Sequence, residues 1–278
     1  NFRSFGEDLN LVARKALMVM KGMQENGVMA VAKHFPGHGD TDVDSHLDLP
    51  VLKHDRRRLE KLEFYPFIQL VNQGVMGVMS AHLHIPAIDT TKNLPATLSP
   101  KFIEEILRKN IDFQGLVFTD ALDMLGVAKY YRDGDAEVRA LKAGNDILLC
   151  PQDVPDAVLA IKKAILDSVL SVEELDCRVM RILVAKEAFN LHQNRLVDLE
   201  ETSKMLSNPR FEHLNRDLYR EALTIVKDQG DLVPLLDARR FNCAYLQVGQ
   251  MGPSPFYERL RIYQDMPYYY CRVGPRKD

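Results

Sequence analysis

Apolar residues recur in this chain first at helical spacing and then in short uninterrupted runs. Between residues 8 and 26 they fall three and four positions apart, which predicts an amphipathic helix that ends at Asn26-Gly27. A short apolar run over 28–32 follows. The later predicted elements are helices over 56–71 and 100–110, the second capped by Ser99, and apolar runs over 75–79, 116–118 and 146–149. Short apolar strands separated by helices predict βαβ units and a parallel sheet.

Polar side chains follow three of these apolar runs. They stand at Lys33-His34, at 80–82 and at Thr119-Asp120. Because ligands bind at the carboxyl ends of the strands in parallel α/β sheets, we expect these residues to face one common site.

The pattern changes after residue 149. Ser171 and Glu174 have the spacing of a capping box, which predicts a helix that continues to about residue 189. Another helix is predicted over 209–222. A strand over 242–248 is predicted to open a second α/β unit.

Composition and charge narrow the class of protein. The 278 residues are 46% hydrophobic and 27% charged, with a net charge of −3. The chain therefore lacks the excess of basic residues that is typical of proteins that bind nucleic acid or an anionic membrane. No apolar run approaches the roughly 18 residues of a membrane-spanning helix.

The four cysteines are far apart in sequence, and we expect reduced, buried thiols. The first residue is Asn1, without the zones of a signal peptide, and no compartment is predicted.

The densest polar cluster is K-H-F-P-G-H-G-D-T-D-V-D-S-H, at residues 33–46. Its two glycines and its proline favour a loop. One interpretation is a calcium site, since Asp40, Asp42 and Asp44 have the early spacing of an EF-hand loop. The sixth position is Ser45 instead of Gly, however, and the twelfth is Val51 instead of Glu.

Three other interpretations of this loop remain open. His34, His38 and His46 with an aspartate are potential zinc or iron ligands, although the helical H-E-x-x-H spacing is absent. Asp44 and His46 are two residues apart, so in an extended segment both side chains point to the same side. A carboxylate there orients an imidazole that donates and accepts protons near neutral pH. The remaining interpretation is a solvated loop of charges.

Asp120 also has two interpretations. It is the N-cap of a helix whose first turn is 121–124, or it is a carboxylate nucleophile aimed into the site from the end of a strand. Lys33 and His34 either pair with neighbouring acids or bind substrate. His82 and His84 are more typical of structural histidines than of catalytic ones.

The loop at 33–46 resembles the signature of glycoside hydrolase family 3, in its β-N-acetylglucosaminidase branch. Three further stretches agree in order, namely R-S-F-G at 3–6, G-V-M-S-A-H within 74–82 and F-T-D-A-L-D-M at 118–124. The resemblance covers most of residues 1–230.

The resemblance implies a role for each matching residue. Asp120 corresponds to the catalytic nucleophile, His46 to the histidine general acid/base and Asp44 to the partner of that histidine. Lys33, His34 and Arg3 correspond to residues that hold the sugar hydroxyls. The β-glucosidase branch lacks the Asp-Ser-His loop and takes its acid/base from a later domain, so the resemblance favours N-acetylglucosaminides.

The implied function is that of a retaining exo-β-N-acetylglucosaminidase that forms a glycosyl-enzyme intermediate and needs no cofactor or metal. The expected partner is a small carbohydrate, an N-acetylglucosamine-containing glycan or muropeptide, as in bacterial turnover of peptidoglycan or chitin oligosaccharides. The alternatives are a β-N-acetylglucosaminide phosphorylase, a β-glucosidase of the same family, and a non-enzymatic sugar-binding or scaffold segment.

The implied fold is α/β. Because R-S-F-G lies near the middle of the family's (β/α)8 TIM-type barrel, residues 1–200 are expected to be the C-terminal half of that barrel, with about four strands. Residues 201–278 are expected to be linker helices and the beginning of an α/β sandwich domain. The resemblance therefore implies a truncated fragment.

Overall fold

The computed structural model describes residues 4–41, 48–193, 196–230, 232–235, 241–249 and 252–273. The chain divides into two compact units, residues 1–196 and 197–278. Arg3, Asp44 and His46 lie outside the described residues.

A three-stranded parallel sheet forms the centre of the first unit, with the strand order β1-β2-β3. The strands are β1 (Val31–Phe35), β2 (Gly77–Ser80) and β3 (Leu116–Thr119). The structure therefore confirms the predicted parallel sheet. The first strand begins later than predicted, so that Lys33 and His34 lie within β1 and not after it.

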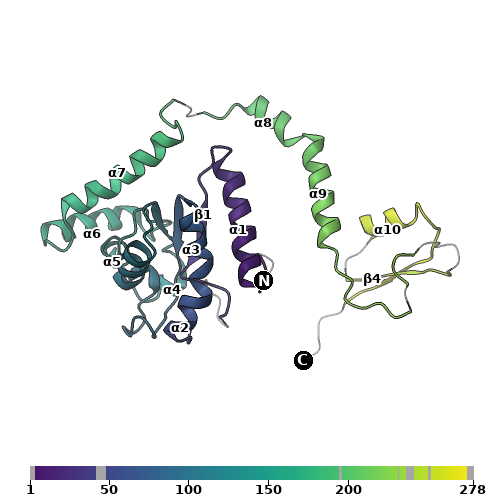
Figure 1. Ribbon diagram of the computed structural model, residues 1–278, viewed down its shortest axis with the longest axis horizontal. Coiled ribbons are helices and arrows are strands. Elements are labelled where there is room, and N and C mark those ends of the chain that lie inside the picture. Colours follow the sequence, from purple (N-terminus) through teal and green to yellow (C-terminus); the bar gives the residue numbers. More distant parts are fainter. Residues whose placement is uncertain are drawn as a thin grey trace. The chain divides into compact units, whose positions relative to one another are not determined.

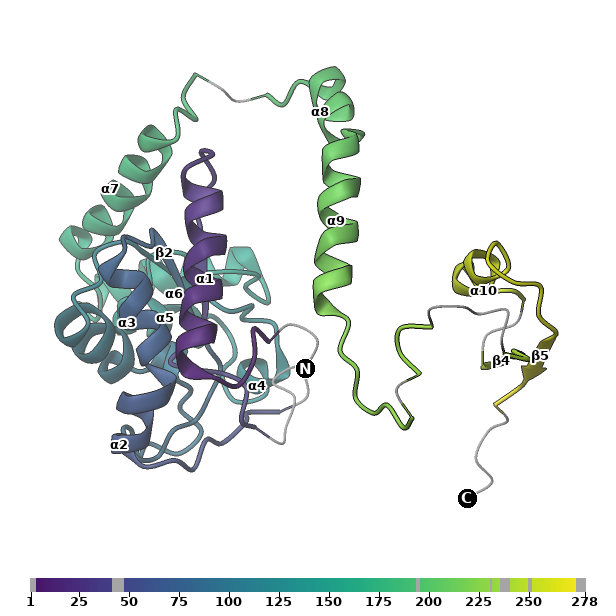
Figure 2. The same ribbon diagram turned by 45° about the vertical axis from the view of Figure 1, so that its right-hand side comes forward.

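Helices cover this sheet. Figure 1 and Figure 2 show α1 and α3 side by side next to β1. The helices of the first unit are α1 (Leu9–Gln24), α2 (Arg56–Arg58), α3 (Tyr65–Asn72), α4 (Leu125–Ala128), α5 (Asp135–Ala143), α6 (Val154–Leu166) and α7 (Val172–Ala188), with the π-helices η1 (Leu59–Glu63) and η3 (Lys101–Asn110) and the 3-10 turn η2 (Ala96–Leu98). The main core joins strands and helices through fully buried side chains, among them Phe35, Leu59, Val78, Phe102 and Val117.

The predicted fourth strand is reduced to a single parallel bridge between Ile147 and Phe118. Its place in the ladder is partly taken by side chains. The carboxylate of Asp146 accepts the Val117 N–H at 2.8 Å, and the Thr119 hydroxyl accepts the Leu149 N–H at 2.9 Å. Side-chain acceptors thus satisfy donors that a regular strand pair would bond through its backbone.

Two predicted helices differ in detail. The helix over 56–71 is divided into α2, η1 and α3, with a wide turn at Phe64, whose N–H donates to the Leu59 carbonyl. Pro66 lies just inside α3, where its missing N–H is tolerated. Ser99 does not cap the next helix, because its hydroxyl donates to Asp89 at 2.6 Å. The capping box of Ser171 and Glu174 is confirmed at the start of α7.

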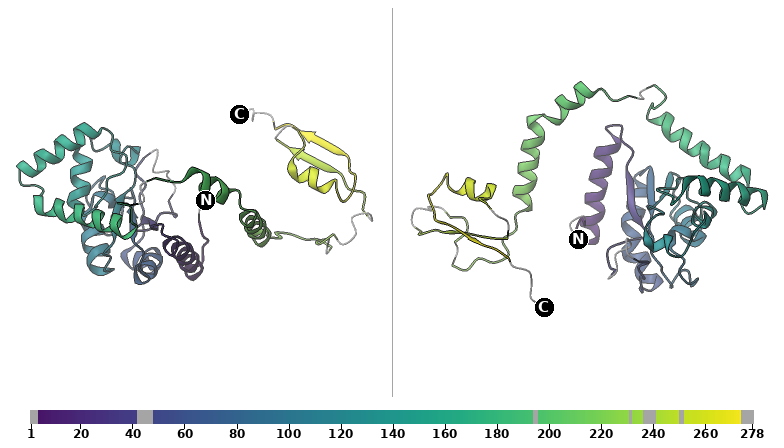
Figure 3. Two further views of the ribbon diagram at one scale, coloured as in Figure 1. Left: turned by 90° about the horizontal axis from the view of Figure 1, so that it is seen from above. Right: turned by 180° about the vertical axis from the view of Figure 1, so that it is seen from behind.

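The second unit contains α8 (Leu199–Leu206), α9 (Pro209–Ala222), β4 (Tyr245–Val248), α10 (Pro255–Leu260) and β5 (Tyr268–Cys271). β4 and β5 pair in parallel, and α10 lies against them, as Figure 3 shows. The rings of Tyr245 and Tyr257 are 4.9 Å apart between centroids, and those of Tyr257 and Tyr268 are also 4.9 Å apart. The predicted α/β character of this part of the chain is confirmed.

All four cysteines are free, as expected, but they are not buried. Cys150, Cys177 and Cys271 are exposed and Cys243 is intermediate, because each lies outside the packed cores. Within the described ranges, no helix is long and apolar enough to cross a membrane.

Candidate active site

An irregularity in β1 determines where His34 lies. Ala32 pairs with Val78 and Phe35 pairs with Ser80, so three steps along β1 match two along β2. The extra residue makes a bulge at Lys33-His34, and a bulge redirects the side chains that it carries. Phe35 anchors the far side of the bulge through the rings of Phe64 and Phe67, with centroid distances of 5.9 and 5.3 Å.

The bulge brings His34 to Asp120, which follows β3. His34 Nε2 lies 3.7 Å from Asp120 Oδ2, and the two side chains are 18% and 19% exposed. Lys33, in the same bulge, is exposed. The structure therefore unites two predicted site residues that are far apart in sequence, at the carboxyl ends of β1 and β3.

Asp120 does not cap a helix. Its N–H donates to the Ser80 carbonyl at 3.0 Å, and its Oδ1 accepts the Ala121 N–H at 3.0 Å. Residues 121–124 form a turn, and α4 begins only at Leu125. The helix-cap interpretation is thus wrong, because the carboxylate bonds the adjacent amide and its second oxygen faces His34.

His82 and His84 hold the backbone around the site. His82 Nε2 lies 2.9 Å from the Ala121 carbonyl, and its Nδ1 lies 2.9 Å from the Thr97 hydroxyl. Burial lowers the pKa of His82, which keeps the imidazole neutral. His84 Nδ1 contacts the Leu94 carbonyl at 3.1 Å. Both histidines therefore have the structural contacts that were predicted for them.

The segment that follows β1 packs closely on η1. A Cβ at Gly37 would lie 2.7 Å from Cβ of Glu63, and Gly37 has a φ of 141°, so only glycine fits there without strain. The His38 ring lies 6.0 Å from the ring of His34. Asp40 binds His54 at 2.8 Å and Arg58 at 3.0 Å. These contacts hold residues 37–41 against α2 and η1.

Asp48 anchors the chain beyond the undescribed residues 42–47. Its carboxylate accepts from Lys129 at 2.9 Å, from the Tyr130 hydroxyl at 3.0 Å and from the Leu49 N–H at 2.8 Å. The hydrogen bond from Lys129 is the largest cause that lowers the pKa of Asp48 to about 2, with the bonds from Leu49 and Tyr130 next. Lys129 and Tyr130 directly follow α4, so this contact joins the two segments that carry the candidate residues.

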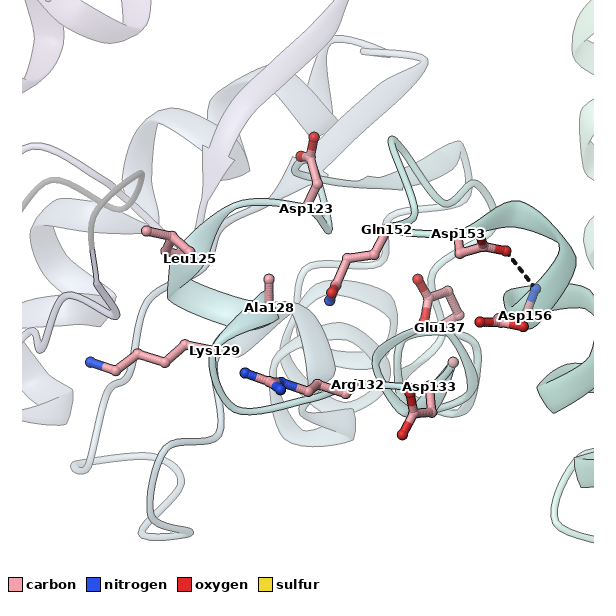
Figure 4. A pocket seen from close by; sticks show the side chains of 11 residues that line it. Asp123, Leu125, Ala128, Lys129, Arg132, Asp133, Glu137, Gln152, Asp153 and Asp156 are labelled. Atoms are coloured by element: carbon pink, nitrogen blue, oxygen red, sulfur yellow. Dashed lines mark hydrogen bonds between the residues drawn. The ribbon is translucent and has the colours of Figure 1, made fainter.

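A polar cavity of about 540 Å³ lies beside α4. Figure 4 shows Glu137 and Gln152 within it, among the side chains of Asp123, Arg132 and Asp133. Desolvation raises the pKa of Glu137, whose side chain is buried there. In the part of the chain that the structure describes, no three His, Cys, Asp or Glu side chains gather as metal ligands.

Sequence reasoning missed two polar side chains near Asp120, those of Thr97 and Asn145. Thr97 and Asn145 are fully buried, and Asn145 bonds Ser80 and the Thr97 carbonyl at 2.8 Å each. The sequence does not mark Asn145, because it stands between Gly144 and Asp146, where a polar residue is typical of a turn.

A parallel α/β sheet that presents a carboxylate beside an imidazole at the carboxyl ends of its strands has the architecture of an α/β enzyme whose ligand binds at that edge of the sheet. The model of the glycosyl hydrolase family 3 N-terminal domain matches residues 1–185. The chain belongs to glycosyl hydrolase family 3, a family of enzymes with an α/β, TIM-barrel-like N-terminal domain.

Curated relatives and solved structures agree with this membership. β-Hexosaminidase A from Pseudoalteromonas piscicida is 33% identical over 85% of this chain and 42% of its own length. A β-N-acetylglucosaminidase/β-glucosidase from Cellulomonas fimi is 27% identical over 86% of this chain and 44% of its own. A family 3 β-N-acetylglucosaminidase from Paenibacillus has a TM-score of 0.85 and 32% identity, over 99% of this chain and 54% of that one. The chain thus spans about half the length of these relatives.

Proposed function

We propose that the protein carrying this chain is a retaining exo-β-N-acetylglucosaminidase. The observation that carries the proposal is the position of Asp120 at the end of β3, with one carboxylate oxygen held by the Ala121 N–H and the other facing His34 at 3.7 Å. A rigidly held carboxylate at a strand end is suited to attack an anomeric carbon. The names of the relatives, β-hexosaminidase and β-N-acetylglucosaminidase, support the N-acetylglucosaminide class.

In the proposed mechanism the Asp120 carboxylate forms a bond to the anomeric carbon while the bond to the leaving oxygen breaks. His46 donates a proton to that oxygen and then accepts one from a water, whose oxygen bonds to the anomeric carbon while the bond between that carbon and Asp120 breaks and frees the carboxylate. Asp44 orients the imidazole of His46. Lys33, His34 and Arg3 hold the sugar hydroxyls. No cofactor or metal takes part in this scheme.

The proposal also assigns the two parts of the chain. Residues 1–200 are the C-terminal part of the family's catalytic barrel, and residues 201–278 are linker helices and the beginning of an α/β sandwich domain. The three paired strands of the first unit and the βαβ arrangement of the second support this assignment.

The decisive experiment replaces Asp120 with asparagine in the protein that carries this chain. We expect hydrolysis of 4-nitrophenyl N-acetyl-β-glucosaminide to fall by roughly 10⁴-fold, because an amide is a poor nucleophile, while the circular dichroism spectrum stays unchanged. Asp112→Asn is the matched control, since Asp112 is an exposed carboxylate just before β3 that faces no site residue. A kcat within tenfold of the wild type in Asp120→Asn would overturn the assignment.

A second measurement tests the acid. General acid catalysis is worth roughly 10²–10⁴-fold and matters most for a poor leaving group. We therefore expect His46→Ala to impair kcat/KM for an unactivated disaccharide far more than for an acidic phenol, and Asp44→Ala to cause a smaller loss of the same pattern. His213→Ala, an exposed histidine on α9, serves as control. Equal losses on both substrates would show that His46 does not donate the proton.

The same assays separate the alternatives. Addition of phosphate tests for phosphorolysis through the appearance of N-acetylglucosamine 1-phosphate, and an aryl β-glucoside tests for β-glucosidase activity. A protein whose melting temperature rises with N-acetylglucosamine but which never turns over a glycoside would be a binding or scaffold protein.

A further inference from the structure

Four buried polar side chains lie behind Asp120, and the mechanism above assigns none of them. Ser80, Thr97 and Asn145 are 0% exposed and His82 is 1% exposed. Ser80 is the last residue of β2 and His82 lies in the segment that follows it, whereas Thr97 lies in η2. Asn145 lies in the segment that follows α5. Buried polar groups are costly unless they are hydrogen-bonded, so their bonding partners are informative.

The first half of the network starts at the backbone of Asp120. The Asp120 N–H donates to the Ser80 carbonyl at 3.0 Å. The Ser80 hydroxyl lies 2.8 Å from Asn145 Oδ1 and 3.1 Å from the Phe118 carbonyl, and we assign its proton to the shorter contact, with Asn145 Oδ1. Asn145 Nδ2 donates to the Thr97 carbonyl at 2.8 Å. Asn145 Nδ2 also donates to the Ala140 carbonyl at 2.8 Å, which fixes the orientation of the amide.

The second half returns to the residue after Asp120. The Ala121 carbonyl can only accept, so the bond at 2.9 Å requires the proton of His82 on Nε2. The pKa of His82 is lowered by burial, so the ring is neutral and Nδ1 is an acceptor. The Thr97 hydroxyl must then donate to Nδ1, at 2.9 Å.

All of these donors therefore point in one direction around the network. It runs from the Asp120 N–H through Ser80, Asn145, Thr97 and His82 to the Ala121 carbonyl, and the backbone of Asp120-Ala121 closes it into a ring. Within the ring, the Asn145 amide and the His82 imidazole each accept at one atom and donate from another, so the hydrogen bonds on either side of these two groups polarise one another.

We propose that this ring positions the nucleophile, and that Ser80, His82, Thr97 and Asn145 are positioning residues. The inference rests on the proposed function of Asp120. The ring holds the backbone on both sides of Asp120, and the Ala121 N–H held between them carries Oδ1 of the carboxylate at 3.0 Å. A tilt of this backbone therefore moves the Asp120 carboxylate directly. A displacement of about 1 Å at a reacting group costs roughly 10²-fold in rate.

Thr97→Val is the variant that tests the proposal, because it removes one hydroxyl with little change in shape from a fully buried side chain whose partner is His82. We expect kcat to fall by roughly 10- to 100-fold with KM unchanged, since binding does not depend on the attack geometry. Activated and unactivated substrates should lose the same factor, because Asp120 attacks both. Thr97→Ser restores the hydroxyl and should recover most of the rate.

Ser99→Ala is the matched structural control. Ser99 is also fully buried and its hydroxyl donates to Asp89 at 2.6 Å, two residues from Thr97 but outside the ring. We expect both variants to lower the melting temperature, whereas only Thr97→Val should lower kcat. Assays are run well below both melting temperatures so that each variant is folded.

Two results would overturn the positioning role. These are a kcat within twofold of the wild type in Thr97→Val, and an equal loss of kcat in Ser99→Ala. The proposed function has its own test, because activity retained in Asp120→Asn would reject the role of Asp120 as nucleophile. An inactive Asp120→Asn together with an unimpaired Thr97→Val rejects the ring alone.

Discussion

Asp146 is the residue whose replacement should most disturb the support of the site. Its side chain is 0% exposed and binds Arg108 at 2.6 Å, Arg181 at 2.8 Å and the Val117 N–H at 2.8 Å. Val117 lies in β3, which leads to Asp120. The carboxylate therefore ties β3 to η3 and α7 at a position where a fourth strand was predicted.

The expected loss of stability in Asp146→Ala follows from the buried groups that would be left without a partner. Arg108 is only 10% exposed at its side chain, and burial already lowers the pKa of its guanidinium. Removal of one partner from a buried ion pair costs about 3–5 kcal/mol, because the other charge stays buried and unpaired. At about 2–4 °C per kcal/mol for a unit of this size, the melting temperature should fall by roughly 6–20 °C. Asp146→Asn keeps one acceptor and should cost less.

Urea unfolding followed by circular dichroism measures this loss, with Asp167→Ala as control. Asp167 pairs with Lys163 on an exposed surface, where such a pair contributes about 0–1 kcal/mol. The double variant Arg108→Met/Asp146→Leu removes both charges and should recover part of the stability. A loss below about 1 kcal/mol in Asp146→Ala would show that solvent screens this pair, and would refute the reasoning.

Two further predictions concern the anchor of Asp48 and the close approach of β2 and β3. The pKa of Asp48 is lowered from its ordinary value of 3.8 to about 2, so its contribution is present above pH 4 and is lost as the pH falls to about 2. Melting temperatures measured over that range should fall less steeply in Lys129→Met than in the wild type, and an unchanged slope would contradict this. In Gly115→Ala the new Cβ would lie 2.2 Å from the Met76 carbonyl oxygen, which accepts the Leu116 N–H, so urea unfolding should show a loss of about 1–3 kcal/mol. Gly22→Ala, with nothing within 4 Å in α1, should instead stabilise by about 0.5–1 kcal/mol, and equal effects of the two substitutions would argue against the clash.

The sequence alone determined the elements whose signals are local. Periodic apolar residues placed α1, the capping box placed the start of α7, and the uninterrupted runs placed β2 and β3 in a parallel sheet. The run at residues 33–46, with three further stretches that agree in order, was enough to indicate the family. Each of these signals is contained within a few turns of helix or one strand, where spacing and side-chain type decide the conformation.

Only the tertiary structure decided how the site is assembled. The bulge that turns His34 toward Asp120 arises from the pairing of β1 with β2, and the ring behind Asp120 joins residues as far apart as Ser80 and Asn145. Asp120 is not a helix cap because its carboxylate bonds the adjacent Ala121 N–H and faces His34, which lies in another strand of the sheet. Such contacts depend on which buried donors meet which acceptors across the fold, and the spacing of residues along the chain does not predict these partners.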